Sequence, residues 1–240
     1  MRAYHHFSVK RNYQHLLISF FVLLVPLFLL MVFSQAADIP IRTSFTDLFI
    51  SSWRLLVAFI IASVIGWLLV VFFVRGKTEN TSLAIFDVLQ SLPTFTILPL
   101  AVHFFGNGES TIIFFLAITI IWPIIFTIVS SLKQADRAWS EAVQISRIKG
   151  FNYIRYYLFP ITAPGLVTGA IIGLGDGWEA LIATEIILKI PEGLGAFFNT
   201  FSDNTVTTFF GVIVFLAIIF SINKLVWLPL LDKSHELIEQ

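Results

Sequence analysis

The stretch TIIFFLAITIIWPIIFTIVSSL, residues Thr111–Leu132, carries no charged side chain from its first position to its last. A helix needs about 20 apolar residues to cross about 30 Å of hydrocarbon, so this stretch predicts a membrane-spanning helix. Pro123 lies inside it, and membrane helices tolerate proline where neighbouring groups satisfy the freed carbonyl. The stretch therefore places the chain among α-helical membrane proteins.

The composition of the whole chain supports this class. Of its 240 residues, 57% are hydrophobic and 12% are charged, whereas soluble domains average about 25% charged residues. This balance excludes a water-soluble globule and an intrinsically disordered chain. The 15 basic and 15 acidic side chains cancel, which argues against a nucleic-acid partner recognised through a basic face. The absence of cysteine removes disulfide scaffolds and thiolate metal sites.

Five further segments complete a prediction of six transmembrane helices. Three are uncharged runs: Leu16–Phe33, Leu55–Val74 and Val206–Asn223. Leu83–Phe105 is weaker, and we expect an interfacial turn followed by a short span from about Leu92. Phe159–Leu188 is long and apolar but contains three acids. The predicted fold class is all-α, a polytopic membrane protein.

The first of these runs also fits a cleaved signal peptide. Arg2, Lys10 and Arg11 precede it, and Ser34-Gln35-Ala36 resembles a cleavage site with small residues. The run is longer than the usual apolar region of about 7–15 residues in a signal peptide, and five more spans follow it. Retention as a membrane anchor is therefore favoured.

The distribution of basic residues predicts the orientation, because short cytoplasmic loops are enriched in lysine and arginine. With the N-terminus inside the cell, the outer side carries only Arg42, Arg54 and Lys189. The other basic residues lie on the inner side: Arg2, Lys10, Arg11, Arg75, Lys77, Lys133, Arg137, Arg147, Lys149, Arg155, Lys224 and Lys233. Both termini are predicted to be cytoplasmic, in a cell inner membrane.

The longest inner segment, residues 133–159, contains a candidate docking helix. Within Asp136–Lys149, alanine and isoleucine recur at helical spacing, and Gly150 marks a helix end. Pro160 is predicted to begin the fifth span, at a position that needs no backbone donor. Periodicity alone is equally consistent with a helix resting on lipid headgroups and with a helix that fits a groove on a cytoplasmic partner.

The residues of this segment resemble the permease subunits of type I ATP-binding-cassette importers. In that family a cytoplasmic loop opens with Glu-Ala-Ala and closes with Leu-Pro; here Glu141-Ala142-Val143 opens it and Phe159-Pro160 closes it at the same distance. Arg147 stands at the family's glycine position, and Gly150 is the nearest glycine. Further pieces resemble the nitrate/sulfonate/taurine branch: Leu89–Pro93, Leu98–Leu100, Phe104–Gly106, Gly177-Trp178, Ala183–Glu185 and Gly193–Gly195.

The resemblance implies an organisation and a set of partners. Residues 55–232 would form the permease core with its coupling loop, preceded by an N-terminal region, 1–54, with the extra helix and an outer loop, and followed by a cytoplasmic tail, 233–240. The partners would be ATPase subunits docked on Glu141, Ala142, Val143, Arg147, Gly150 and Pro160, a second permease copy or paralogue, an extracytoplasmic substrate-binding protein and membrane lipid. No phosphate-binding Gly-x-x-x-x-Gly-Lys-Ser/Thr motif occurs, so ATP hydrolysis is expected on a partner, and neither a cofactor nor a metal site is predicted here.

The fifth span carries the candidate solute path. Its glycines recur every fourth residue, as Gly165, Gly169, Gly173 and Gly177, a pattern that lets membrane helices approach closely; we expect paired bundles to rock about these contacts. Acids at membrane depth usually face a polar cavity or a partner. The candidates for the path are Asp176, Trp178, Glu179 and Glu185, although Glu185 points nearly the opposite way on a regular helix. Hydrogen bonding of these acids within the bundle is the equal alternative.

Two other functions compete with the importer permease. An ion- or proton-coupled secondary transporter would use the acids of the fifth span as a relay, but it predicts internal repeats, and the two halves show no self-similarity. A membrane enzyme lacks a catalytic constellation, because the five histidines form no group with acids or serines. Negative charge at Asp176 and Glu179 would oppose anions, so a cationic or hydrogen-bonding solute is the hypothesis.

Overall fold

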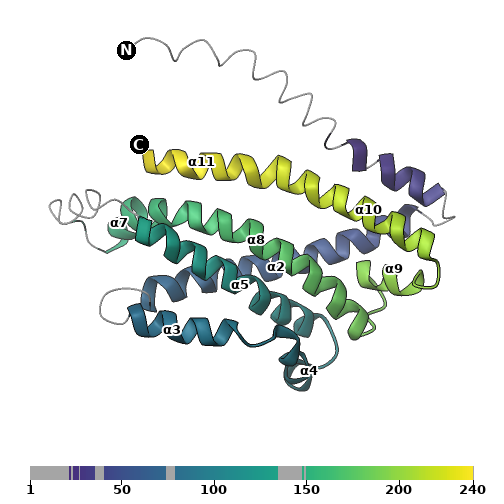
Figure 1. Cartoon of the computed structure of the whole chain (residues 1–240), viewed down its shortest axis with the longest axis horizontal. Helices are drawn as coiled ribbons and strands as arrows, with labels where there is room; N and C mark the ends of the chain where they lie inside the picture. The colour runs from purple at the N-terminus through teal and green to yellow at the C-terminus, as the bar shows by residue number, and fades with distance from the viewer. Residues whose placement is uncertain are drawn as a thin grey trace, which may run out of the picture.

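The computed structural model describes residues 22, 24–26, 28–35, 41–73, 79–134, 148 and 150–239. Helices account for nearly all of these residues, and none of them lies in a strand. The prediction of an all-α membrane protein is confirmed. Figure 1 shows the long helices running side by side, with the short helices α4 (Leu98–Phe105) and α9 (Leu194–Thr200) lying away from the end where α7 (Phe151–Tyr153) is found.

Among the described residues, four helices are long and apolar enough to cross a membrane. They correspond to the predicted second, fourth, fifth and sixth spans. The second of the four, α5, is the centre of the bundle, and many of its side chains, such as Ile120, Ile124 and Ile128, are completely buried. The four helices are α2 (Ile41–Phe73), α5 (Glu109–Gln134), α8 (Phe159–Ile187) and α10 (Thr205–Ile222), the last running on through a π-helical turn (Asn223–Trp227) into α11 (Leu228–Glu239).

Helix α2 begins well before the predicted start at Leu55. We expected an outer loop over residues 34–54, but the helix already runs from Ile41. Residues 41–65 contain neither glycine nor proline, so nothing interrupts the helical backbone. Three polar side chains in this added part, Ser44, Ser51 and Arg54, are buried against the bundle, and this burial explains why a polar stretch is helical.

The predicted third span is broken rather than continuous. Helix α3 (Glu79–Gln90) and the segment from Thr94 to Phe105, which ends in α4 (Leu98–Phe105), are bent by 75° relative to each other. Pro93 lies at the bend, where its ring and missing N–H prevent a continuous helix. Counting the bent pair as one span gives five spans in the described part of the chain.

The predicted first span, Leu16–Phe33, lies largely outside the described residues. Its described end belongs to an apolar helix over Leu24–Gln35, in which Leu30 and Phe33 pack against Phe197 and Val214. The Ser221 hydroxyl donates a hydrogen bond of 2.6 Å to the Val22 carbonyl. The N-terminal helix therefore packs on α9 (Leu194–Thr200) and α10.

The glycine ridge of α8 packs against α5 of the same chain. A Cβ atom built on Gly165 would lie 2.5 Å from the Thr127 carbonyl oxygen, and one on Gly169 would lie 2.6 Å from the Ile124 Cα. Both separations are far below van der Waals contact, so only glycine lets the two backbones approach this closely. Because α5 occupies the ridge, these glycines are not available for the expected contact between two bundles.

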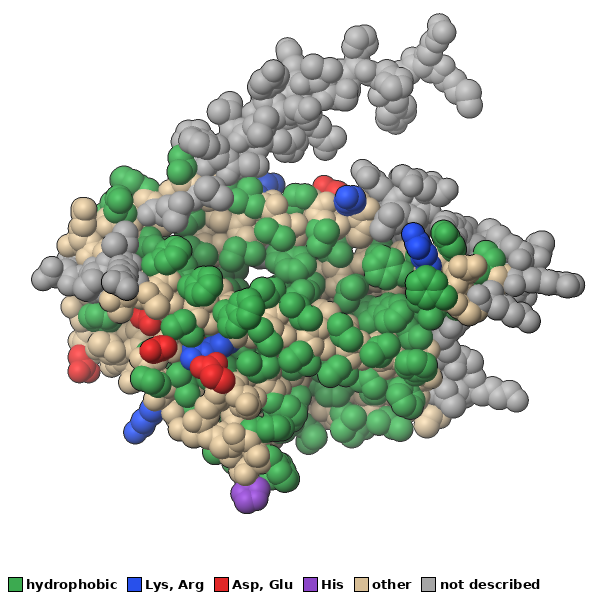
Figure 2. Space-filling view, turned by 180° about the vertical axis from the view of Figure 1, so that it is seen from behind, with side chains coloured by type: hydrophobic (Ala, Val, Ile, Leu, Met, Phe, Trp, Pro, Cys, Tyr) green, Lys and Arg blue, Asp and Glu red, His purple; other side chains and the backbone are tan. Residues whose placement is uncertain are grey.

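The surface has the character of a membrane protein. Figure 2 shows a broad hydrophobic face across the middle of the molecule, with charged side chains collected toward its left end and upper edge. Large apolar side chains are exposed along the long helices, among them Phe72, Ile172 and Phe209. Exposed apolar area on this scale marks a surface that meets lipid or other subunits.

Candidate functional site

A groove of about 670 Å³ opens between α5, α8 and the bend that follows α3. Asp176 and Glu179 lie on its α8 wall, and both are exposed. Pockets of about 300–1,000 Å³ typically accommodate small molecules. The full lining consists of Gln90, Pro93, Thr94, Phe95, Thr119, Trp122, Pro123, Phe126, Thr127, Ile172, Asp176, Glu179 and Ala180.

The two groove acids have no partner among the residues that the structure describes: no hydrogen bond or ion pair joins Asp176 or Glu179 to another side chain. The hydroxyls of Thr119 and Thr127 donate to carbonyls of their own helix, at 3.0 Å to Phe115 and 2.7 Å to Pro123. The carboxylates are therefore the strongest hydrogen-bond acceptors that the groove offers to a bound molecule.

Trp178 lies on the opposite side of α8 from these acids. It is 6% exposed and packs edge-to-face on Phe215 of α10, with ring centroids 5.1 Å apart. It lines a separate apolar cavity of about 260 Å³ that α2 and α10 also border. The expected grouping of Trp178 with Asp176 and Glu179 is corrected, because a two-residue step turns a regular helix by about 200°.

Glu185 also faces away from the groove, as its helical phase predicted, so its place among the candidates for the path is corrected. Its side chain is completely buried, and Arg54 of α2 donates to it from Nη1 at 2.7 Å. The Ser51 hydroxyl donates at 2.8 Å, and the Gly195 N–H donates to the other carboxylate oxygen at 2.7 Å. The Glu185 carboxylate is thus held by three donors that come from α2 and α9, rather than facing the groove.

The Arg54 guanidinium links this carboxylate to two other parts of the chain. Its Nε donates to Glu109 at the start of α5, at 2.8 Å, and its Nη1 also donates to the Glu192 carbonyl at 2.8 Å. The backbone N–H of Gly193 donates to Asp47 at 3.0 Å. This buried charge network, centred on Arg54 and Glu185, therefore ties α2, α5, α8 and the residues before α9 together at one end of the bundle.

Sequence reasoning missed Arg54, which it placed at the end of the outer loop, just before the second span. The signal was present as a polar stripe: Asp47, Ser51 and Arg54 recur at intervals of four and three along α2. That spacing puts their side chains on one face of a helix. A buried charge in a membrane protein needs a partner of opposite charge. For Arg54 this partner is Glu185, one of the three acids of the fifth span.

The segment before α8 begins as helix earlier than predicted. Gly150 adopts φ +63°, a left-handed conformation, and helix starts at Phe151 rather than at Pro160. A π-helical turn over Ile154–Leu158 leads into α8. In a regular α-helix the ring of Pro160 would clash with the carbonyl group four residues earlier, and proline has no N–H to donate to it. The wider π-helical turn avoids this clash. Glu141, Ala142, Val143 and Arg147, predicted for docking, lie outside the described residues.

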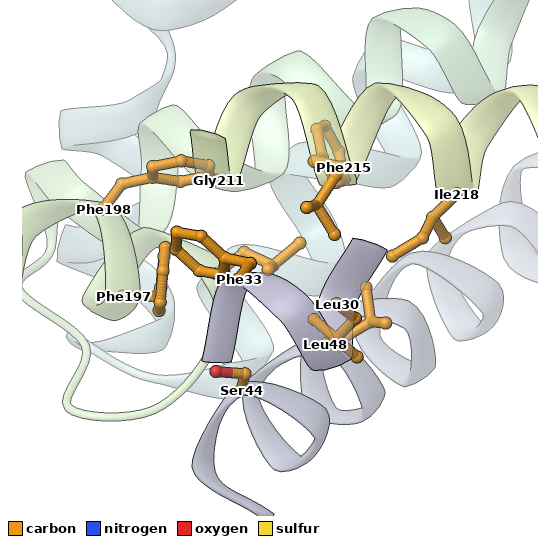
Figure 3. Close-up of a pocket in the computed structure, with 11 residues that line it drawn as sticks. Leu30, Phe33, Ser44, Leu48, Phe197, Phe198, Gly211, Phe215 and Ile218 are labelled. Atoms are coloured by element: carbon orange, nitrogen blue, oxygen red, sulfur yellow. The ribbon is translucent and has the colours of Figure 1, made fainter. Parts of the chain in front are cut away.

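A third and smaller cavity lies where the N-terminal helix meets α2, α9 and α10. Figure 3 shows Leu30, Phe33 and Phe197 lining it, with Ser44 as the polar side chain among the labelled residues. Its volume is about 30 Å³, whereas a single water needs roughly 10–15 Å³ on this scale. The cavity is too small for a transported solute, so the groove at Asp176 and Glu179 is the stronger candidate site.

These features define a polytopic α-helical membrane protein with a central buried helix and an acidic groove. The chain belongs to the family described as binding-protein-dependent transport system inner membrane component, which matches residues 62–228. The resemblance predicted from the sequence is thereby confirmed at the level of the family.

Several proteins named as transport permeases are similar to this chain. The nitrate import permease protein NrtB of Synechocystis sp. is 27% identical over 175 residues, which cover 72% of this chain and 63% of that protein. The bicarbonate transport system permease protein CmpB of Synechococcus elongatus is 24% identical over 68% of this chain and 59% of its own length. The taurine transport system permease protein TauC of Escherichia coli is 30% identical over 46% of this chain and 40% of its own. The chain thus matches about three fifths, or less, of each relative.

Proposed function

We propose that this chain is the membrane-spanning permease subunit of an ATP-driven importer and that it forms part of the solute path. The match of residues 62–228 to the permease family carries this proposal. The relatives named for nitrate, bicarbonate and taurine transport support it. ATP would be bound and hydrolysed by separate cytoplasmic subunits, and an extracytoplasmic binding protein would deliver the solute to a pair of permeases.

The coupling element in this proposal is the segment of residues 133–159. Glu141, Ala142 and Val143 would lie at the docking surface for the ATPase, with Arg147 near the turn. Gly150 permits a left-handed turn, and helix then continues without a break from Phe151 to Ile187. Asp176 lies 25 residues along that helix, about 38 Å at 1.5 Å per residue. A displacement of the docked loop would therefore reach the groove through one continuous helix.

The mechanism is an alternation between inward-open and outward-open states. Closure of the ATPase pair on ATP would displace the docked loops and, with them, the α8 helices. Because α8 is packed backbone to backbone on α5 along its glycines, the two helices would move as one body, and the groove walls on α5 and α8 would keep their geometry. Rigid-body motion of one bundle against another is the usual form of alternating access.

Charge reversal at the docking surface tests the proposal. We expect Glu141→Lys to lower the ATPase recovered with the chain by at least about tenfold, equivalent to about 1.4 kcal/mol of binding free energy. The measurement is purification of the full chain in mild detergent, followed by an assay of ATP hydrolysis and identification of the co-purified ATPase subunit. Asp203→Lys is the matched control, because it makes the same change of charge in the exposed turn after α9.

Two results would contradict the proposal. The first is equal recovery of the ATPase with Glu141→Lys and with the unmodified chain. The second is solute uptake into vesicles that an ion gradient drives in the absence of any ATPase, which is the behaviour of a secondary transporter.

A further inference from the structure

The groove at Asp176 and Glu179 has a chemical preference that follows from its lining. None of its thirteen described lining residues is lysine, arginine or histidine. Both carboxylates point at the groove from α8 without a partner in the described part of the chain, while Arg54, a buried cation of the bundle, is held by Glu109 and Glu185. The groove therefore carries negative charge that nothing in its own walls balances.

The depth of these acids makes the imbalance significant. Asp176 lies 11 residues from the end of α8 at Ile187, which is about 16 Å along the helix and far from either end of α8. Acids at such depth are costly unless a cation or a polar cavity accommodates them. In the buried charge network, Arg54 is the cation that pairs with Glu185. The described lining of the groove contains no cation, so a positively charged group from outside the chain would be needed to balance Asp176 and Glu179.

The remaining walls favour an organic cation over a metal ion. Trp122 and Phe126 of α5 and Phe95 of the bend bring aromatic rings to the same groove. Aromatic faces attract ammonium groups through their quadrupole, whereas metal ions such as calcium and magnesium require about six oxygen ligands. The volume of about 670 Å³ also suits a small organic molecule.

We infer that the groove passes solutes that carry a protonated amine or quaternary ammonium group, with Asp176 and Glu179 as the acceptors and the aromatic wall against the cation. This inference rests on the proposed function, because it names the class of solute for the same path. It separates this chain from relatives named for nitrate and bicarbonate, since an inorganic anion would meet two negative charges here and no positive one.

The absence of cysteine from the chain allows a direct test. Thr119→Cys places one thiol on the α5 wall of the groove, and the full chain in lipid nanodiscs is treated with methanethiosulfonates that carry either a trimethylammonium or a sulfonate group. We expect the ratio of the cationic to the anionic reaction rate to exceed that of free cysteine by roughly tenfold or more, because fields focused in clefts concentrate ions of opposite charge by such factors.

Removal of the two charges should abolish this preference. Asp176→Asn with Glu179→Gln, in the Thr119→Cys background, should return the ratio to that of free cysteine. Glu192→Gln with Asp203→Asn removes the same charge from exposed residues outside the groove and should leave the ratio high. Ile172→Cys, on the α8 wall, is the second reporter if Thr119→Cys fails to fold.

A protection experiment addresses ligand class. Benzyltrimethylammonium should slow the reaction of the Thr119→Cys thiol with uncharged methyl methanethiosulfonate at least threefold, and benzenesulfonate at the same concentration should not. Equal protection by both compounds, or a rate ratio that the amide substitutions leave unchanged, would overturn the inference. Neither measurement requires a partner subunit, so failure of ATPase recovery would count against the proposed function without altering this result.

Discussion

Replacement of Arg54 with glutamine is expected to lower the free energy of unfolding by about 3–5 kcal/mol, the range for breaking a buried ion pair from one side. The side chain of Arg54 is 3% exposed and that of its partner Glu185 is not exposed at all. The substitution leaves the Glu185 carboxylate buried with only the donors of Ser51 and Gly195. Equilibrium unfolding of the full chain in mixed detergent micelles measures the loss.

Two companion variants make this result specific to the pair. The combination of Arg54→Gln with Glu185→Gln should recover a large part of the lost stability, because neither member then remains as an unpaired buried charge. Glu109→Gln should cost less than about 1 kcal/mol, since the Glu109 side chain is 59% exposed and exposed ion pairs contribute little. If Glu109→Gln lowered the stability as much as Arg54→Gln, the exposed Arg54–Glu109 pair, rather than the buried Arg54–Glu185 pair, would be the one that stabilises the bundle.

Gly169→Leu is expected to prevent the native packing of α8 on α5, with a loss of more than about 3 kcal/mol. Even a Cβ at this position would lie 2.6 Å from the Ile124 Cα and 3.0 Å from the Pro123 carbonyl oxygen. Backbone atoms cannot move aside as a flexible side chain can, so the helices must separate. Overpacking by a few methylene groups already costs about 1–3 kcal/mol in a well-packed core.

The matched control for this prediction lies on the same helix. A Cβ on Gly175 meets no atom within 4 Å, so Gly175→Ala should leave the midpoint of unfolding unchanged or raise it slightly, because alanine is the better helix former. The measurement is again equilibrium unfolding in micelles. If Gly169→Leu left the midpoint of unfolding as little changed as Gly175→Ala, then α5 and α8 could not be in close backbone contact at Gly169.

Much of the fold could be predicted because lipid imposes a simple rule on sequence. Uncharged runs of about 20 residues identified α5 and α10 and the apolar part of α2. The beginning of α2 escaped prediction because Ser51 and Arg54 look like loop residues until their burial against Glu185 is known. Hydropathy reads each residue alone, whereas the cost of a buried charge depends on a partner more than a hundred positions away in the chain.

The candidate site was predicted only in part, because sequence gives the position of a residue on a helix but not the elements that pack around it. Helical phase correctly separated Glu185 from Asp176, since both lie on one regular helix. The same reasoning, applied to Trp178, would have moved it to the side of Glu185, but proximity in sequence to Asp176 obscured this. The π-helical turn before Pro160 could not be predicted, because a proline inside a long helix is equally compatible with a helix start, a kink or a widened turn.

The way in which α9 is attached determines which of its residues can be substituted freely. The short helix is fastened through the backbone N–H groups of Gly193, Leu194 and Gly195, which donate to Asp47, Ser51 and Glu185. The exposed side chains of Asn199 and Thr200 make none of these hydrogen bonds and carry no part of the attachment. Substitutions at these two positions therefore leave the attachment of α9 intact. New binding residues could be engineered there without changing the helices beneath α9.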